Sequence, residues 1–132
     1  MTRVLGLALV ALTAATTVSA CSDDADFCSL ATDQQVADTL TEFNPDDIPG
    51  TLITLRDARD QEATLRDAAP DAIRADIDLL VSYLDDLIDG LEDVDPNSED
   101  RPQIFDELRP RNESINAASA RIETYVIANC TE

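Results

Sequence analysis

Apolar residues recur at helical spacing in four segments of the chain. The clearest segment covers about residues 70–91, where the apolar positions follow one another at alternating intervals of four and three. These positions are Ile73, Ile77, Leu80, Leu84, Leu87 and Leu91. Val81 and Ile88 widen the stripe, as is typical of a helix that faces a core. No segment alternates strictly between apolar and polar residues, so the pattern predicts an all-α protein.

The first two helical segments are predicted at about 28–43 and 48–69. The first ends before Pro45, because the residue that precedes a proline avoids the helical conformation. Thr32 and Gln35 have the spacing of a capping box, so the regular part of this helix starts either near residue 28 or only at Thr32. Asp47 is the expected N-cap of the second helix.

The fourth helical segment is predicted from about 100–102 to Cys130. Two prolines interrupt the helical pattern, Pro70 between the second and third segments and Pro110 within the fourth. A proline removes a backbone donor and either kinks or ends a helix. The sequence leaves both outcomes open at both positions.

Glu62 occupies an apolar register position of the second segment. The 3-4 series there consists of Leu52, Leu55, Ala58, Glu62, Leu65 and Ala69. Glu62 also precedes Arg66 by four residues, the favourable order for an acid and a base on one helix surface. We therefore predict a Glu62–Arg66 ion pair.

The N-terminal residues have the pattern of an export signal. Arg3 precedes an uncharged apolar run, residues 4–15, which is too short to cross a bilayer as a stable helix. Small residues follow and lead into Cys21. The ending Val18-Ser19-Ala20-Cys21 resembles the lipobox of bacterial lipoproteins, and the chain as a whole resembles the small lipoproteins of unknown function common in actinobacteria.

The lipobox resemblance implies that residues 1–20 are removed and that Cys21 becomes a lipidated first residue. The mature protein would then sit on the extracytoplasmic face of the cell membrane, with residues 21–27 as a short acidic tether and 28–132 as the folded domain. A plain secretory signal cut at the same bond is the alternative, and it would leave Cys21 as a free thiol.

The chain contains three cysteines, an odd number for an exported protein. If Cys21 carries the lipid, Cys28 and Cys130 remain as a pair in an oxidising compartment, and we predict a disulfide between them. Four helices with short connections predict an up-down-up-down four-helix bundle. In that topology Cys28 and Cys130 fall at the same end of the bundle, which agrees with the pairing.

Charge and composition narrow the possible functions. The chain has 28 acidic and 9 basic residues, all of the latter arginines, and no histidine. This balance argues against nucleic-acid binding, which needs basic surface. The missing histidine excludes Ser-His-Asp and Cys-His catalysis, and no glycine-rich phosphate loop is present. We therefore expect a non-catalytic binding or interaction module without a cofactor, whose partner is an envelope protein or a small ligand.

The loops 44–50 and 92–101 are acidic and are expected at the membrane-distal end. Their weak candidates for metal binding are Asp46, Asp47, Asp93, Asp95 and Glu99. The run from Asp93 to Glu99 resembles the start of a calcium loop, but Ser98 stands where that loop needs glycine and Ile104 where it needs glutamate. A looser cation site remains the alternative, in which the protein binds a divalent cation or another small ligand through these loops.

Overall fold

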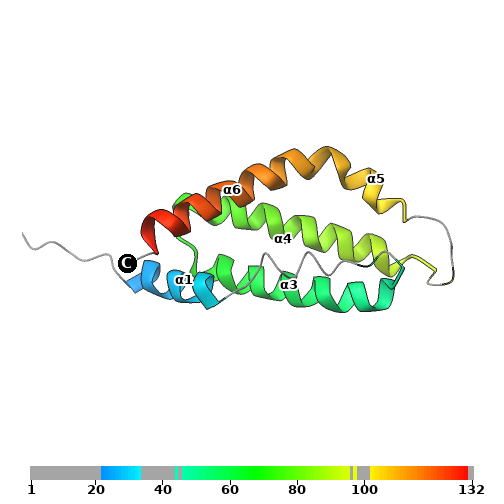
Figure 1. Ribbon diagram of the computed structural model, residues 1–132, viewed down its shortest axis with the longest axis horizontal. Coiled ribbons are helices and arrows are strands. Elements are labelled where there is room, and N and C mark those ends of the chain that lie inside the picture. The colour runs from blue at the N-terminus through cyan, green and yellow to red at the C-terminus, as the bar shows by residue number, and fades with distance from the viewer. Residues whose placement is uncertain (1–21, 34–43, 45, 96, 98–101, 131–132) are drawn as a thin grey trace, which may run out of the picture.

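The computed structural model describes residues 22–33, 44, 46–95, 97 and 102–130. Within these residues all regular secondary structure is helical, and the helices form a bundle (Figure 1). Its elements are α1 (Ser22–Asp33), α3 (Ile48–Ala68), α4 (Asp71–Glu92), α5 (Ile104–Leu108), the 3-10 turn η2 (Arg109–Arg111) and α6 (Asn112–Asn129). The second and third predicted helices are thereby confirmed.

Pro70 separates α3 from α4. Ala69 has an extended backbone that ends α3, with φ −69° and ψ 137°. The carbonyl of Pro70 accepts hydrogen bonds from the amides of Ile73 and Arg74, which starts α4. The two helices therefore turn back on each other and lie side by side in opposite directions (Figure 1).

The apolar stripe of α4 forms the centre of the core. α4 packs against α3, α5 and α6, and its side chains take part in two separate apolar clusters. One cluster lies near the start of α3, where Leu55 and Ala58 meet Leu84 and Leu91. The other lies near the α3–α4 turn and includes Ile77.

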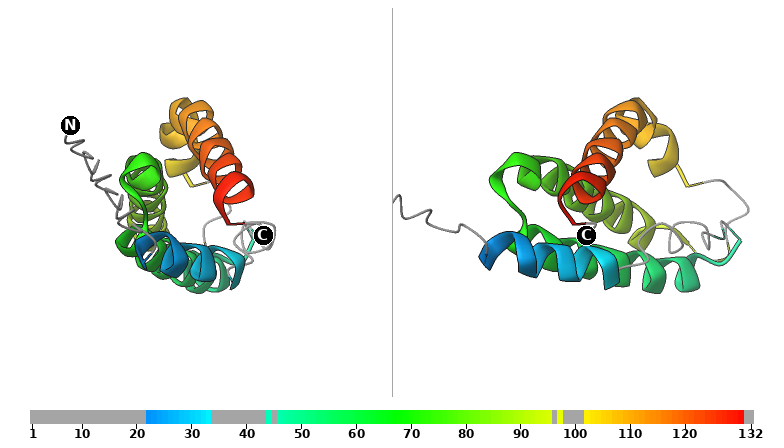
Figure 2. Two further views of the ribbon diagram at one scale, coloured as in Figure 1. Left: turned by 90° about the vertical axis from the view of Figure 1, so that its left-hand side faces the viewer. Right: turned by 60° about the vertical axis from the view of Figure 1, so that its left-hand side comes forward.

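Pro110 divides the fourth predicted segment. It lies in η2, a single 3-10 turn that joins the short α5 to α6. α6 then runs back along α4. Two ion pairs show this direction, since Arg111 pairs with Asp86 and Arg121 pairs with Asp76. Figure 2 shows that α6 crosses α4 and that the C-terminal end of α6 approaches α1.

The first helix begins earlier than predicted. α1 starts at Ser22, so the expected start near Cys28 is wrong, and residues 22–27 are helical where we expected a tether. The run Ser22-Asp23-Asp24 explains the difference, because serine and acidic residues favour the first turn of a helix. Residues 34–43 of the predicted first helix lie outside the described residues.

Phe27 attaches α1 to the bundle. Its side chain is fully buried, and it belongs to the cluster near the α3–α4 turn. The ring meets Tyr125 of α6 edge to face, with centroids 5.9 Å apart and planes at 76°. This arrangement is the favourable one for two aromatic rings, so it joins α1 to α6 as well as to α3.

Among the described residues, none of the helices combines the length and the apolar character that crossing a membrane would require.

Replacing Ile77 by alanine is expected to destabilise the bundle. Ile77 is fully buried at the centre of α4, so Ile77→Ala removes apolar contacts and leaves a cavity, which costs about 2–5 kcal/mol. Urea unfolding followed by circular dichroism measures the change. Ile53→Ala is the matched control, because Ile53 is 61% exposed, and equal losses for the two variants would contradict the placement of the core.

Candidate functional site

One end of the bundle carries the disulfide between Cys28 and Cys130. The two Cα atoms are 5.1 Å apart, and the bond ties α1 to the end of α6. Cys21, the predicted lipidation site, lies outside the described residues, but α1 begins immediately after it at Ser22. A helix rises about 1.5 Å per residue, so the path from Ser22 to Cys28 is about 9 Å long rather than an extended tether.

The opposite end of the α3–α4 pair carries the acidic loops. Asp47 is the N-cap of α3, as predicted, and its carboxylate accepts a hydrogen bond from the amide of Gly50 at 3.0 Å. A Cβ atom at residue 50 would lie 2.3 Å from this carboxylate, so the cap requires the close approach that glycine permits. Asp46 is exposed beside the cap.

The loop after α4 uses its carboxylates in a similar way. Asp95 accepts hydrogen bonds from the backbone amide of Asn97 at 2.9 Å and from its side chain at 3.1 Å. Asp93 is exposed, and Glu99 lies outside the described residues. In the described part of the chain, no three or more His, Cys, Asp or Glu side chains are grouped so that they could hold a metal ion.

A shallow apolar groove lies at the same end, between the start of α3 and the end of α4. It encloses about 390 Å³ and is lined by Ile48, Pro49, Leu52, Ile53, Arg56, Leu91, Glu92 and Val94. Arg56 and Glu92 form an ion pair of 2.5 Å at its edge. Ile53 is 61% exposed, which makes it the most accessible large apolar side chain of the groove.

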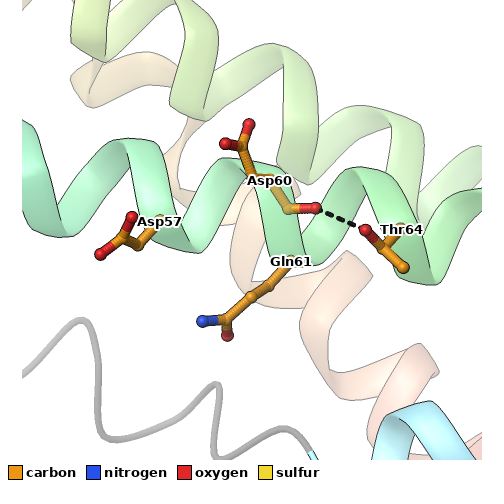
Figure 3. Close-up of a pocket in the computed structure, with 4 residues that line it drawn as sticks. All are labelled: Asp57, Asp60, Gln61 and Thr64. Atoms are coloured by element: carbon orange, nitrogen blue, oxygen red, sulfur yellow. Dashed lines mark hydrogen bonds between the residues drawn. The ribbon is translucent and has the colours of Figure 1, made fainter.

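A second hollow lies along the exposed face of α3 (Figure 3). It measures about 410 Å³ and is lined by Asp57, Asp60, Gln61 and Thr64, all from one helix. The hydroxyl of Thr64 donates a hydrogen bond to the backbone carbonyl of Asp60 at 2.9 Å, within the same helix. Ligand sites usually combine apolar side chains with a few convergent polar groups, whereas the four residues that line this hollow are all polar.

Glu62 is the most unusual side chain of the described bundle. It is only 4% exposed, and its Oε2 atom has no hydrogen-bond partner. Burial raises the pKa of Glu62 from 4.5 to about 7, because the charged form loses its hydration. The carboxyl group is therefore largely protonated in mildly acidic solution.

The predicted ion pair between Glu62 and Arg66 is wrong. Arg66 lies instead within ion-pair distance of Asp67, at 3.2 Å, and of Asp78 on α4, at 3.7 Å. The reason is the orientation of α3, which turns position 62 toward the core and leaves position 66 on its flank. The sequence already indicated that Glu62 is buried, because Glu62 stands in the apolar 3-4 series.

Ion pairs join α4 to both of its long neighbours. Every arginine in the described ranges is paired with a carboxylate, namely Arg56, Arg59, Arg66, Arg74, Arg109, Arg111 and Arg121. The partners on the α3 side of α4 are Asp78, Asp85 and Glu92, which are seven residues apart and therefore share one side of the helix. The described surface thus offers no arginine that is without an acidic neighbour.

Tyr83 takes part in the contact between α4 and α6. It is half-buried there, and its hydroxyl lies 3.3 Å from the side-chain oxygen of Asn112. The guanidinium of Arg111 lies 5.6 Å from the centre of its ring, a cation–π distance. This residue therefore supports the packing of the two helices.

Comparison with known proteins identifies no relative, since no protein-family model, no curated protein and no solved structure matches the chain.

Removing the disulfide is expected to destabilise the protein substantially. The bond joins residues 102 positions apart, and a closed loop of that length restricts the unfolded chain by up to about 4–5 kcal/mol. Cys130→Ser should therefore lower the urea midpoint strongly. Adding a reductant to the wild type should lower it equally, whereas an unchanged midpoint in both cases would show that the bond does not form.

Proposed function

We propose that this protein is a lipoprotein anchored through Cys21 to the extracytoplasmic face of a bacterial cell membrane. The observation that carries the proposal is the N-terminal series of Arg3, the apolar run and Val18-Ser19-Ala20-Cys21. The disulfide supports it, because Cys28 and Cys130 are committed to each other and Cys21 is the remaining cysteine of the chain. A disulfide also suits an oxidising compartment outside the cytoplasm.

We also propose the finer topology, an up-down-up-down four-helix bundle. α1 packs near the end of α3 and is tied to the end of α6, whereas Asn44 lies at the start of α3, where its carbonyl accepts the Thr51 hydroxyl. α1 and the end of α6 therefore lie at one end of the bundle, and Asn44 lies at the other.

The bundle is proposed to act by binding a partner protein of the envelope. The support is the apolar groove at the end away from the disulfide, where Ile53 is exposed. Exposed acidic residues lie near it, among them Asp46, Asp47 and Asp93. Charge complementarity then favours a partner segment that carries an apolar side chain beside basic residues.

The described residues favour this interaction role over the cation-binding alternative. Asp47 and Asp95 are engaged as a helix cap and in a turn, and neither is grouped with other acidic ligands in the described part of the chain.

Replacing Cys21 is expected to detach the protein from the membrane. Cys21→Ala removes the proposed lipid-bearing thiol, and a domain with an excess of negative charge has little affinity for an anionic bilayer surface. In detergent phase partitioning the variant should enter the aqueous phase, and mass spectrometry of the intact protein should show no lipid on it. Cys130→Ser is the matched control and should keep the lipid, whereas membrane retention of Cys21→Ala would contradict the anchor.

Photocrosslinking in living cells tests the interaction role. A crosslinking amino acid at Ile53 should capture a partner protein, while the same amino acid at Asn116, exposed on α6, should not. Ile53→Asp should weaken capture from a third position at the edge of the groove, such as Pro49, because it places a like charge in the acidic surroundings. Equal capture at Ile53 and Asn116 would contradict the groove as the interaction surface.

A further inference from the structure

Glu62 lies at the boundary between the two apolar clusters of the core. On one side along α3, Ala58 belongs to the cluster that contains Leu84. On the other side, Leu65 belongs to the cluster that contains Ile77. A buried polar atom without a partner destabilises a fold, so the unpartnered Oε2 atom of Glu62 at this boundary calls for an explanation.

We propose that Glu62 is a pH-sensitive switch at the interface of α3 and α4. When the carboxyl group is neutral, it stays buried between the two clusters and α3 remains packed on α4. When the group is ionised, it leaves the interface and loosens α3 from α4. The inference concerns the fold alone and stands independently of the lipid anchor.

Two ion pairs between α3 and α4 flank this carboxyl group. Arg59, three residues before Glu62, lies 3.0 Å from Asp85. Arg66, four residues after Glu62, lies 3.7 Å from Asp78. Each arginine also has a neighbouring aspartate on α3 itself, at 2.8 Å and 3.2 Å respectively. Both guanidinium groups are therefore engaged elsewhere while the carboxyl group is buried.

The other described elements offer Glu62 no further cation. α1 packs against α3 through apolar side chains such as Phe27, and its Asp26 is exposed. α6 packs on α4, where Arg121 is held by Asp76 through two hydrogen bonds of 3.0 Å, and its Glu123 is exposed. Arg59 and Arg66 therefore remain as the described cations one helical turn from Glu62 along α3.

Ionised Glu62 has a partner within reach once it turns outward. Arg66 is four residues further along α3, in the order that favours an ion pair. If Arg66 exchanges Asp78 for Glu62, an ion pair between two helices becomes an ion pair within one helix. α3 then loses a link to α4 at the same place where water enters the core.

The direction of the pH dependence follows from the raised pKa of Glu62, about 7 in the folded protein against 4.5 for an ordinary glutamate. Between these values the folded protein keeps a proton that the unfolded chain has lost. The contribution of Glu62 to stability is therefore fully present below about pH 4.5, falls as the pH rises through this window and is lost above about pH 7. The chain has no histidine, so it has no side chain whose ordinary pKa lies between 5 and 8.

Urea unfolding of the full-length protein in detergent, at pH values from 5 to 8, tests the switch. For the wild type, the unfolding equilibrium constant should rise roughly 50- to 100-fold across this range. Glu62→Gln has nearly the same shape but cannot ionise, so its unfolding constant should stay constant. Glu123→Gln changes an exposed glutamate of α6 and should keep the full dependence.

A second measurement uses the wild type alone, in case Glu62→Gln does not fold. Infrared spectra should contain the carbonyl band of a protonated carboxylic acid at pH 6, and this band should be lost by pH 8. Three results would overturn the proposal: a wild-type unfolding constant that does not change with pH, an equal pH dependence in Glu62→Gln, or no protonated carboxyl group at pH 6.

Discussion

The structure depends on the burial of one apolar stripe, that of α4. The stripe runs the length of the helix and takes part in both clusters of the core, so α3, α5 and α6 all pack against it. α6 is mostly exposed and has a single fully buried residue, Ala118, within the described part of the chain. α1 is attached by Phe27 and by the disulfide. These attachments matter because a domain of this size has a limited core, and a covalent link between distant residues compensates by restricting the unfolded chain.

Electrostatics shapes the surface of the same helix. The chain carries 28 acidic and 9 basic residues, so the number of arginines limits how many ion pairs can form. Five of the seven arginines in the described ranges link α4 to a neighbouring element, as at Asp85 and Asp78 toward α3 and at Asp76 and Asp86 toward α6. Arg74 and Arg109 instead pair with an aspartate three residues away in the sequence. Exposed ion pairs contribute little stability each, but their positions fix how neighbouring helices align. The other acidic residues whose side chains the structure describes are exposed, with the exception of Glu62.

Glu62 departs from this division between apolar core and charged flank. An apolar residue of similar size at that position would remove the desolvation cost and join the two clusters. A carboxyl group there instead links the packing of α3 and α4 to the protonation state of one side chain. The lipoprotein location that we propose would expose this carboxyl group to the pH outside the cytoplasm.

The sequence by itself determined the helical class, the approximate extent of the segments that form α3 and α4, and the Asp47 cap. These follow from local spacing and from a capping residue. The pairing of Cys28 with Cys130 was predicted from the lipobox resemblance, which sets Cys21 aside and leaves two cysteines. Only the tertiary structure decided whether Pro70 and Pro110 separate or kink helices, because that depends on how the flanking segments pack. The tertiary structure also decided where the Glu62 side chain lies. Spacing along α3 allowed both a buried position and a pair with Arg66, and only the rotation of α3 against α4, set by burial of the neighbouring Ala58 and Leu65, turned the carboxyl group inward.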